Sequence, residues 1–86
     1  MLQEIFTLAV VIFGILMSAA HFPQAQKILK TKSSKDISLV TYSIFTLGAY
    51  IWLAYGFVIN ELPIILSFLI AVVGITLVLL LAVKFR

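Results

Sequence analysis

Aromatic, hydroxyl and small side chains recur at helical spacing in the middle of this chain. Thr41, Phe45, Gly48, Trp52 and Tyr55 follow one another at intervals of three or four residues, which places them on one face of a helix. Trp52 carries a flat apolar ring with a single N–H donor, a shape suited to stacking against the C–H face of a sugar ring. A tryptophan that packs in a core or faces lipid is equally compatible with the position.

His21 is the one ionisable side chain that lies well inside an apolar stretch, and it shares a helical face with Thr7, Gly14 and Ser18. We expect this face to point inward, away from lipid. No Asp, Glu, Lys or Arg accompanies the imidazole, so a neutral, hydrogen-bonded residue of a cavity or interface is favoured over a proton site.

Several chemistries are excluded by composition. The chain contains no cysteine, which rules out disulfides, thiolate metal sites and a cysteine nucleophile. It also offers no nucleophile paired with a base, no cluster of metal ligands and no glycine-rich phosphate loop. We therefore expect no enzyme, no metal and no cofactor.

Three apolar stretches must position these residues. With 64% hydrophobic and 10% charged residues, the 86-residue chain has too little polar surface to cover a soluble globule. A helix needs roughly 20 residues to cross a bilayer core of about 30 Å, and the segments 5–26, 38–59 and 62–83 meet that length. The sequence predicts an all-α integral membrane protein in which residues 1–86 form a single domain of three transmembrane helices in the cell membrane. A cleavable signal peptide ending near Ser18-Ala19-Ala20 is disfavoured, because Glu4 and no basic residue precede a long apolar run.

Charge predicts the orientation of these helices. The basic residues lie in the first loop and in the tail, on one side of the membrane if three helices cross: Lys27, Lys30, Lys32, Lys35, Lys84 and Arg86. The positive-inside rule then places the N-terminus outside and the C-terminus inside. The net charge of +3 reflects topology and attraction to anionic lipid headgroups better than nucleic-acid binding, because stacking aromatics do not interleave with the charges.

The expected helix boundaries have local causes. Residues 27–36 are polar, and Asp36 or Ser38 can cap the second helix. The short Asn60-Glu61 turn requires antiparallel neighbours, and Pro63 fits the first turn of the third helix.

Pro23 lies near the end of the first apolar stretch, but residues after it still have a helical pattern. A kinked continuation is therefore at least as plausible as a helix end. The carbonyl that loses its partner would need another, from Gln24 or a neighbouring helix. Such a kink can bend and so can gate.

The third stretch carries Ser67, Ala71 and Gly74 as a stripe of small residues, which favours close helix contact. Three helices cannot surround a sugar-sized passage and also bury their own polar stripes. Self-association about a two-fold axis along the membrane normal is the simplest closed solution.

An ordered set of short motifs resembles the bacterial SemiSWEET sugar transporters of the PQ-loop superfamily over almost the full chain. The motifs are Pro23-Gln24, Thr31-Lys32, Asp36-Ile37-Ser38, Tyr42, Leu47-Gly48, Trp52, Tyr55-Gly56 and Leu62-Pro63-Ile64-Ile65. The resemblance implies a three-helix bundle that forms a parallel homodimer around a central cavity, opens alternately to either side and moves a mono- or disaccharide by facilitated diffusion.

The resemblance also implies roles for individual residues. Trp52 matches the substrate-stacking tryptophan, Pro23 the hinge, Tyr55 the outer gate, and Phe45 and Tyr42 resemble the inner gate. The position where the family usually has an asparagine beside the tryptophan is Phe68 here, which leaves the substrate class open. Together with neighbouring positions, the expected site comprises Trp52, Phe68, Ser67 and Gly48 for substrate, Pro23 and Gln24 as hinge, Tyr55 and Glu61 at the outer gate, and Phe45, Tyr42 and His21 at the inner gate.

Two other functions remain open from the sequence. A proton-coupled PQ-loop transporter of another metabolite would use His21 as its switch. A non-transporting assembly subunit would use the small-residue stripes to bind a larger membrane partner.

Overall fold

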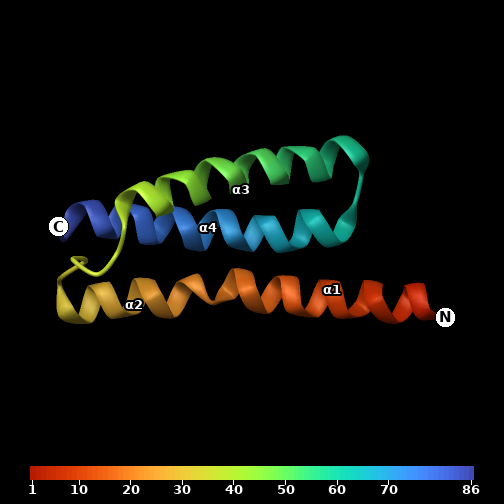
Figure 1. The fold of residues 1–86 in the computed structure, drawn as a ribbon, viewed down its shortest axis with the longest axis horizontal. Coiled ribbons are helices and arrows are strands. Elements are labelled where there is room, and N and C mark those ends of the chain that lie inside the picture. Colours follow the sequence, from red (N-terminus) through yellow and green to blue (C-terminus); the bar gives the residue numbers. More distant parts are fainter.

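The computed structural model describes residues 1–86, and its regular elements are all helices (Figure 1). They are α1 (Leu2–Ala19), α2 (His21–Thr31), α3 (Leu39–Ile59) and α4 (Leu62–Lys84). Since α1 and α2 follow one another in a single apolar stretch of 30 residues, the chain has 3 helices long and apolar enough to cross a membrane. We call the α1–α2 unit the first span.

The first span is interrupted at Ala20, three residues before Pro23. Proline has no N–H and its ring crowds the carbonyl four residues earlier, so Pro23 disrupts the helix at Ala19 and Ala20 and not at its own position. The expected continuation of the helix past Pro23 is confirmed, because α2 runs to Thr31. The Gln24 side chain makes no hydrogen bond and so does not supply the partner expected of it.

The first loop is shorter than the sequence indicated. Lys27 and Lys30 belong to α2, which ends at Lys32 in the left-handed conformation with φ 52°. Placing these two lysines in a loop was wrong, because falling hydropathy marks where a helix leaves the apolar layer and not where its backbone hydrogen bonds stop.

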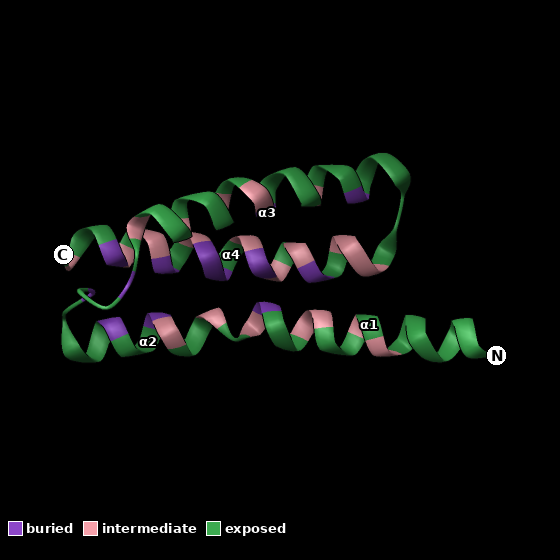
Figure 2. Ribbon diagram, viewed as in Figure 1, coloured by how far each residue is buried: buried purple, intermediate pink, exposed green.

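Helix α4 lies between the first span and α3, and the backbones of α1 and α3 do not approach each other (Figure 1). Helix α4 contributes more of the buried residues than any other helix, whereas the outer faces of its neighbours are exposed (Figure 2). The exposed side chains are predominantly apolar, as lipid contact requires.

The expected small-residue stripe is the contact between α4 and the first span. A Cβ added at Gly74 would lie 3.1 Å from the His21 Cβ, and one added at Gly14 would lie 3.2 Å from the Ser67 Cβ. The helices approach this closely only because small residues face each other. The prediction that Gly14, Ser18 and His21 point inward is therefore confirmed.

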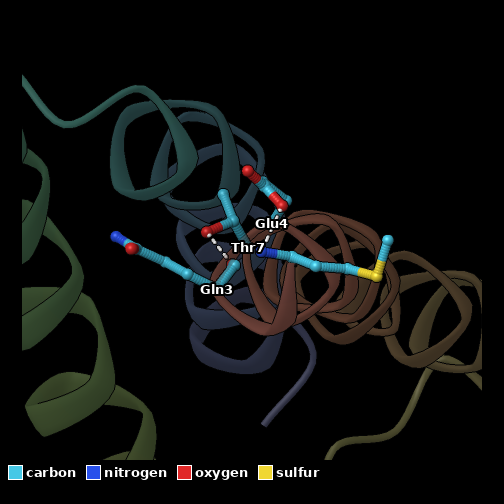
Figure 3. A network of polar contacts seen from close by, with 4 residues as sticks. Gln3, Glu4 and Thr7 are labelled. Carbon is cyan, nitrogen blue, oxygen red and sulfur yellow. Dashed lines mark hydrogen bonds and ion pairs between the residues drawn. The ribbon is translucent and has the colours of Figure 1, made fainter.

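Thr7 departs from that prediction. Helix α1 begins beyond the start of α4, so the first turns have no neighbour to pack against (Figure 1). Thr7 is exposed, and its hydroxyl donates to the Gln3 carbonyl at 2.7 Å beside an ion pair of 2.9 Å between the N-terminal ammonium and Glu4 (Figure 3).

At the opposite end of the bundle, hydrogen bonds join the α2–α3 loop to the end of α4. Arg86 donates from Nη1 to the carbonyls of Ser34 and Ile37 at 2.6 and 2.7 Å, and the Ser34 hydroxyl donates to the Ala82 carbonyl at 2.7 Å. Beneath these bonds lies the larger apolar cluster of the chain: Ala25, Ile28, Ile37, Val78 and Ala82. The α2–α3 loop is therefore fastened to the end of α4.

Both turns of α3 follow the expected chemistry. The Ser38 hydroxyl accepts from the Thr41 N–H at 3.1 Å and caps the helix, and Asn60 ends it in the left-handed conformation with φ 55°. Pro63 lies in the first turn of α4, antiparallel to α3.

Gly56 is where we expect substitution to harm the fold most directly. A Cβ at this position would lie 2.8 Å from the Ile64 Cγ2, which is fixed to the β-carbon and cannot swing away, so Gly56→Ala must push α3 from α4. We expect a loss of about 1–3 kcal/mol, measured by thermal unfolding in detergent. Gly48→Ala is the control, because nothing lies within 4 Å of its added Cβ; equal stability of the two variants would contradict the packing described here.

Candidate functional site

Two pockets meet at Phe68. The aromatic pocket, of about 390 Å³, opens between α3 and α4 and is lined by Phe45, Gly48, Trp52 and Phe68 among others. The hydroxyl pocket, of about 360 Å³, opens between α1 and α4 and is lined by Ser18 and Ser67 among others. His21, Phe68 and Ile75 line both pockets, so the two are halves of one surface divided by the Phe68 ring.

Trp52 stacks on Phe68. The ring centroids are 5.7 Å apart and the planes differ by 9°, so α3 and α4 present a double aromatic layer. Trp52 keeps 50% of its surface exposed, which leaves part of the indole free to contact a ligand. Tyr55 meets the Trp52 ring edge-on at 5.8 Å, one turn nearer the α3–α4 turn.

The residues expected at the inner gate form a second aromatic group toward the basic end of the bundle. His21 Nδ1 lies 3.2 Å from the Tyr42 hydroxyl, and the Tyr42 ring meets Phe45 edge-on at 5.6 Å. The His21–Tyr42 contact is the hydrogen bond that joins the first span to α3, since their backbones are separated by α4. His21 is thus a hydrogen-bonded residue between helices.

Gly48 and Ser67 occupy different halves of the surface. Gly48 faces the aromatic pocket, where an added Cβ would meet no atom within 4 Å. Ser67 lies in the hydroxyl pocket, as expected from its offset of about 100° from Phe68 on an ideal helix.

Not every expected residue is close to these pockets. Glu61 is exposed in the α3–α4 turn, and no hydrogen bond or ion pair joins it to Tyr55. Pro23 and Gln24 line neither pocket, and Gln24 faces a groove with the residues that follow α2.

Several pocket residues were missing from the sequence-based site, among them Ile75 and Ser18. Ile75 lies seven residues after Phe68, and Ser18 lies three before His21. Helical spacing from the residues already assigned would have found both.

These surfaces are suited to binding. They combine aromatic and aliphatic side chains with a few neutral polar groups and no charged residue, the usual lining of a small-molecule site. The pockets lie along the apolar helices, and the hydroxyl pocket extends to the first turn of α4. The fold and the site together define a small helical membrane protein with a surface suited to an uncharged small molecule.

Comparison with known proteins gives the family. The family described as "Sugar efflux transporter for intercellular exchange" matches residues 4–86. The sugar transporter SemiSWEET of Leptospira biflexa is 33% identical over 66 residues, which cover 77% of this chain and 78% of that protein. That of Bradyrhizobium diazoefficiens is 42% identical over 50 residues, which cover 58% of each. A crystal structure of a bacterial homologue of SWEET transporters matches with a TM-score of 0.86 and 35% identity, covering 95% of this chain and 99% of that one.

The chain therefore belongs to the SWEET family of sugar transporters, in its SemiSWEET group, as its sequence motifs indicated. It is a multi-pass protein of the cell membrane.

Proposed function

We propose that this chain moves a small uncharged sugar, a mono- or disaccharide, across the membrane by facilitated diffusion through a parallel homodimer with alternating access. The observation that carries the proposal is the Trp52–Phe68 stack, half exposed in a pocket within the apolar length of the helices. An aromatic face of this kind binds the C–H face of a sugar without requiring charge. Membership of a sugar-transporter family supports the same conclusion.

The incomplete enclosure of the site supports the proposed homodimer. One chain supplies a wall made of the first span, α4 and α3, and half of the Trp52 surface is exposed on it. A second copy related by a two-fold axis along the membrane normal would close the passage and keep both N-termini outside. Each sugar would then lie between two Trp52 rings.

The gates are assigned from the positions of the aromatic groups. Tyr55, with Glu61 at the membrane surface, would close the outer side, and the His21, Tyr42 and Phe45 group would close the inner side. His21 directly follows the interruption at Ala20 and bonds to Tyr42, so bending there would move His21 relative to α3. This arrangement links the hinge at Pro23 to the inner gate.

We expect Pro23→Ala to slow transport without weakening sugar binding. Alanine restores the N–H that can bond to the Ala19 carbonyl and stiffens the helix where the first span is interrupted. The maximal exchange rate should fall about tenfold with KM nearly unchanged, measured with labelled sugar in liposomes. A rate equal to that of the unmodified protein would remove Pro23 as the hinge.

The test of the function is equilibrium exchange of labelled glucose and sucrose into liposomes that contain the purified protein, with and without a pH gradient. Saturable exchange that ignores the gradient is the expected result. Exchange driven by the gradient and lost in His21→Gln would favour the proton-coupled alternative. If no sugar exchanges and a stoichiometric membrane partner co-purifies after gentle extraction, the assembly-subunit alternative would be favoured.

A further inference from the structure

Two serine residues are largely buried, but their hydroxyl oxygens remain accessible, because no enclosed side-chain oxygen of the chain lacks a hydrogen-bond partner. Ser18 and Ser67 each keep 8% of their surface exposed, they face each other's helices across the hydroxyl pocket, and neither side chain has a hydrogen-bond partner in the chain. Three threonine hydroxyls in the same helices or their neighbours behave differently, since each donates to the carbonyl four residues earlier: Thr7, Thr31 and Thr46.

Helix packing alone does not account for these serines. Alanine or glycine would allow the same close contact between the helices, whereas each serine adds a hydroxyl that is free to bond a ligand in the pocket. Gly14 supports this interpretation, because a Cβ at that position would collide with the Ser67 hydroxyl. Glycine at position 14 of α1 therefore leaves space for the Ser67 hydroxyl of α4.

The aromatic pocket has no hydroxyl group of its own. Its polar side-chain groups are the Trp52 N–H and the His21 imidazole, which is already bonded to Tyr42. The hydroxyl pocket shares Phe68 and His21 with it, so a ring stacked on the aromatic layer can extend its polar edge past Phe68 toward the serines.

We propose that Ser18 and Ser67 form a polar subsite that binds hydroxyl groups of the transported sugar and selects which sugars are accepted. This inference rests on the proposed function and adds to it the residues that recognise the hydroxyl groups of the sugar. A serine hydroxyl both donates and accepts, which matches a sugar hydroxyl. Because no cationic side chain lines either pocket, the subsite fits neutral sugars and not sugar phosphates or sugar acids.

The experiment compares glucose with glucose derivatives that each lack one hydroxyl, by exchange in liposomes. For the unmodified protein, removal of a hydroxyl that the subsite binds should lower kcat/KM on the order of tenfold. In Ser18→Ala or Ser67→Ala, kcat/KM for glucose itself should fall by a similar factor. The preference for glucose over that one derivative should disappear. Thr76→Val is the matched control, because Thr76 lies on the opposite face of α4 and pairs with Tyr50 at 3.4 Å.

The ratio of kcat/KM for glucose to kcat/KM for the derivative separates recognition from folding. A merely structural effect would lower both values together. If an alanine variant does not purify as a uniform species, Ser18→Cys and Ser67→Cys keep the volume and replace the hydroxyl with a weak donor. Unchanged ratios in all variants, or equal exchange of glucose and every derivative by the unmodified protein, would overturn the subsite while leaving sugar transport standing. Failure of the unmodified protein to exchange any sugar would overturn the proposed function and the subsite together.

Discussion

Replacement of Trp52 by alanine is expected to lower kcat/KM for sugar exchange about a hundredfold. Each protomer of the proposed dimer would contribute one indole, and loss of an aromatic contact costs roughly 1.4 kcal/mol, or about tenfold, per ring. The Phe68 ring loses its stacking partner at the same time, so it is also free to leave its position. The measurement is concentration-dependent exchange of labelled sugar in liposomes with equal protein content.

Two further variants distinguish stacking from a general effect. Trp52→Phe keeps an aromatic face and should recover most of the activity. Tyr50→Ala removes an exposed aromatic residue from the other side of the same helix and should exchange sugar normally. Full transport by Trp52→Ala would remove the aromatic pocket as the binding site, whatever the family.

Gly48→Leu is expected to abolish sugar exchange while leaving the folded chain intact. Gly48 lines the aromatic pocket, and the absence of any atom within 4 Å of an added Cβ shows that a larger side chain meets open space and not a neighbouring helix. The isobutyl group of leucine would then occupy the volume of about 390 Å³ that the sugar needs. We expect exchange at least a hundredfold below that of the unmodified protein, since transport requires the pocket to be empty between cycles.

The matched control is Gly48→Ala, whose methyl group fills little of the pocket and should cause an intermediate loss. Thermal unfolding and the size of the purified species should be unchanged in both variants, which separates a filled pocket from a damaged dimer. If Gly48→Leu transports normally, the space beside Gly48 is not on the path of the sugar.

The helices and the aromatic face of α3 were predictable because lipid imposes a simple rule on each helix separately. Apolar length gave the three spanning helices, and helical spacing brought Phe45, Gly48 and Trp52 to one pocket. The order of the helices in space was not predictable in this way. A stripe of small or polar residues indicates which face of a helix avoids lipid, but it does not identify the helix that packs against that face. The place of α4 between the first span and α3 therefore came only from the structure.

Details that depend on a neighbour were the ones the sequence missed or misplaced. Thr7 has the right spacing to face inward, but no helix reaches it at that level. The closeness of Phe68 to Trp52 was expected only from the family resemblance, and the parallel stacking of the two rings was not predicted because it depends on the register between α3 and α4. Ser18 was recognised as part of an inward face, and only its place in the pocket lining marks it as a site residue.

The central place of α4 has a consequence for biosynthesis. Helices leave the ribosome in chain order, yet the helix against which both α1 and α3 pack is made after both of them. Until α4 enters the bilayer, the first span and α3 must persist as separate helices that are stable in lipid on their own. Insertion and assembly are therefore two distinct events, and a nascent chain stalled before α4 should be integrated in the membrane but remain open to proteases and labelling reagents. Helix α4, fastened by Arg86 to the loop made earlier, then joins the first span to α3 in one step.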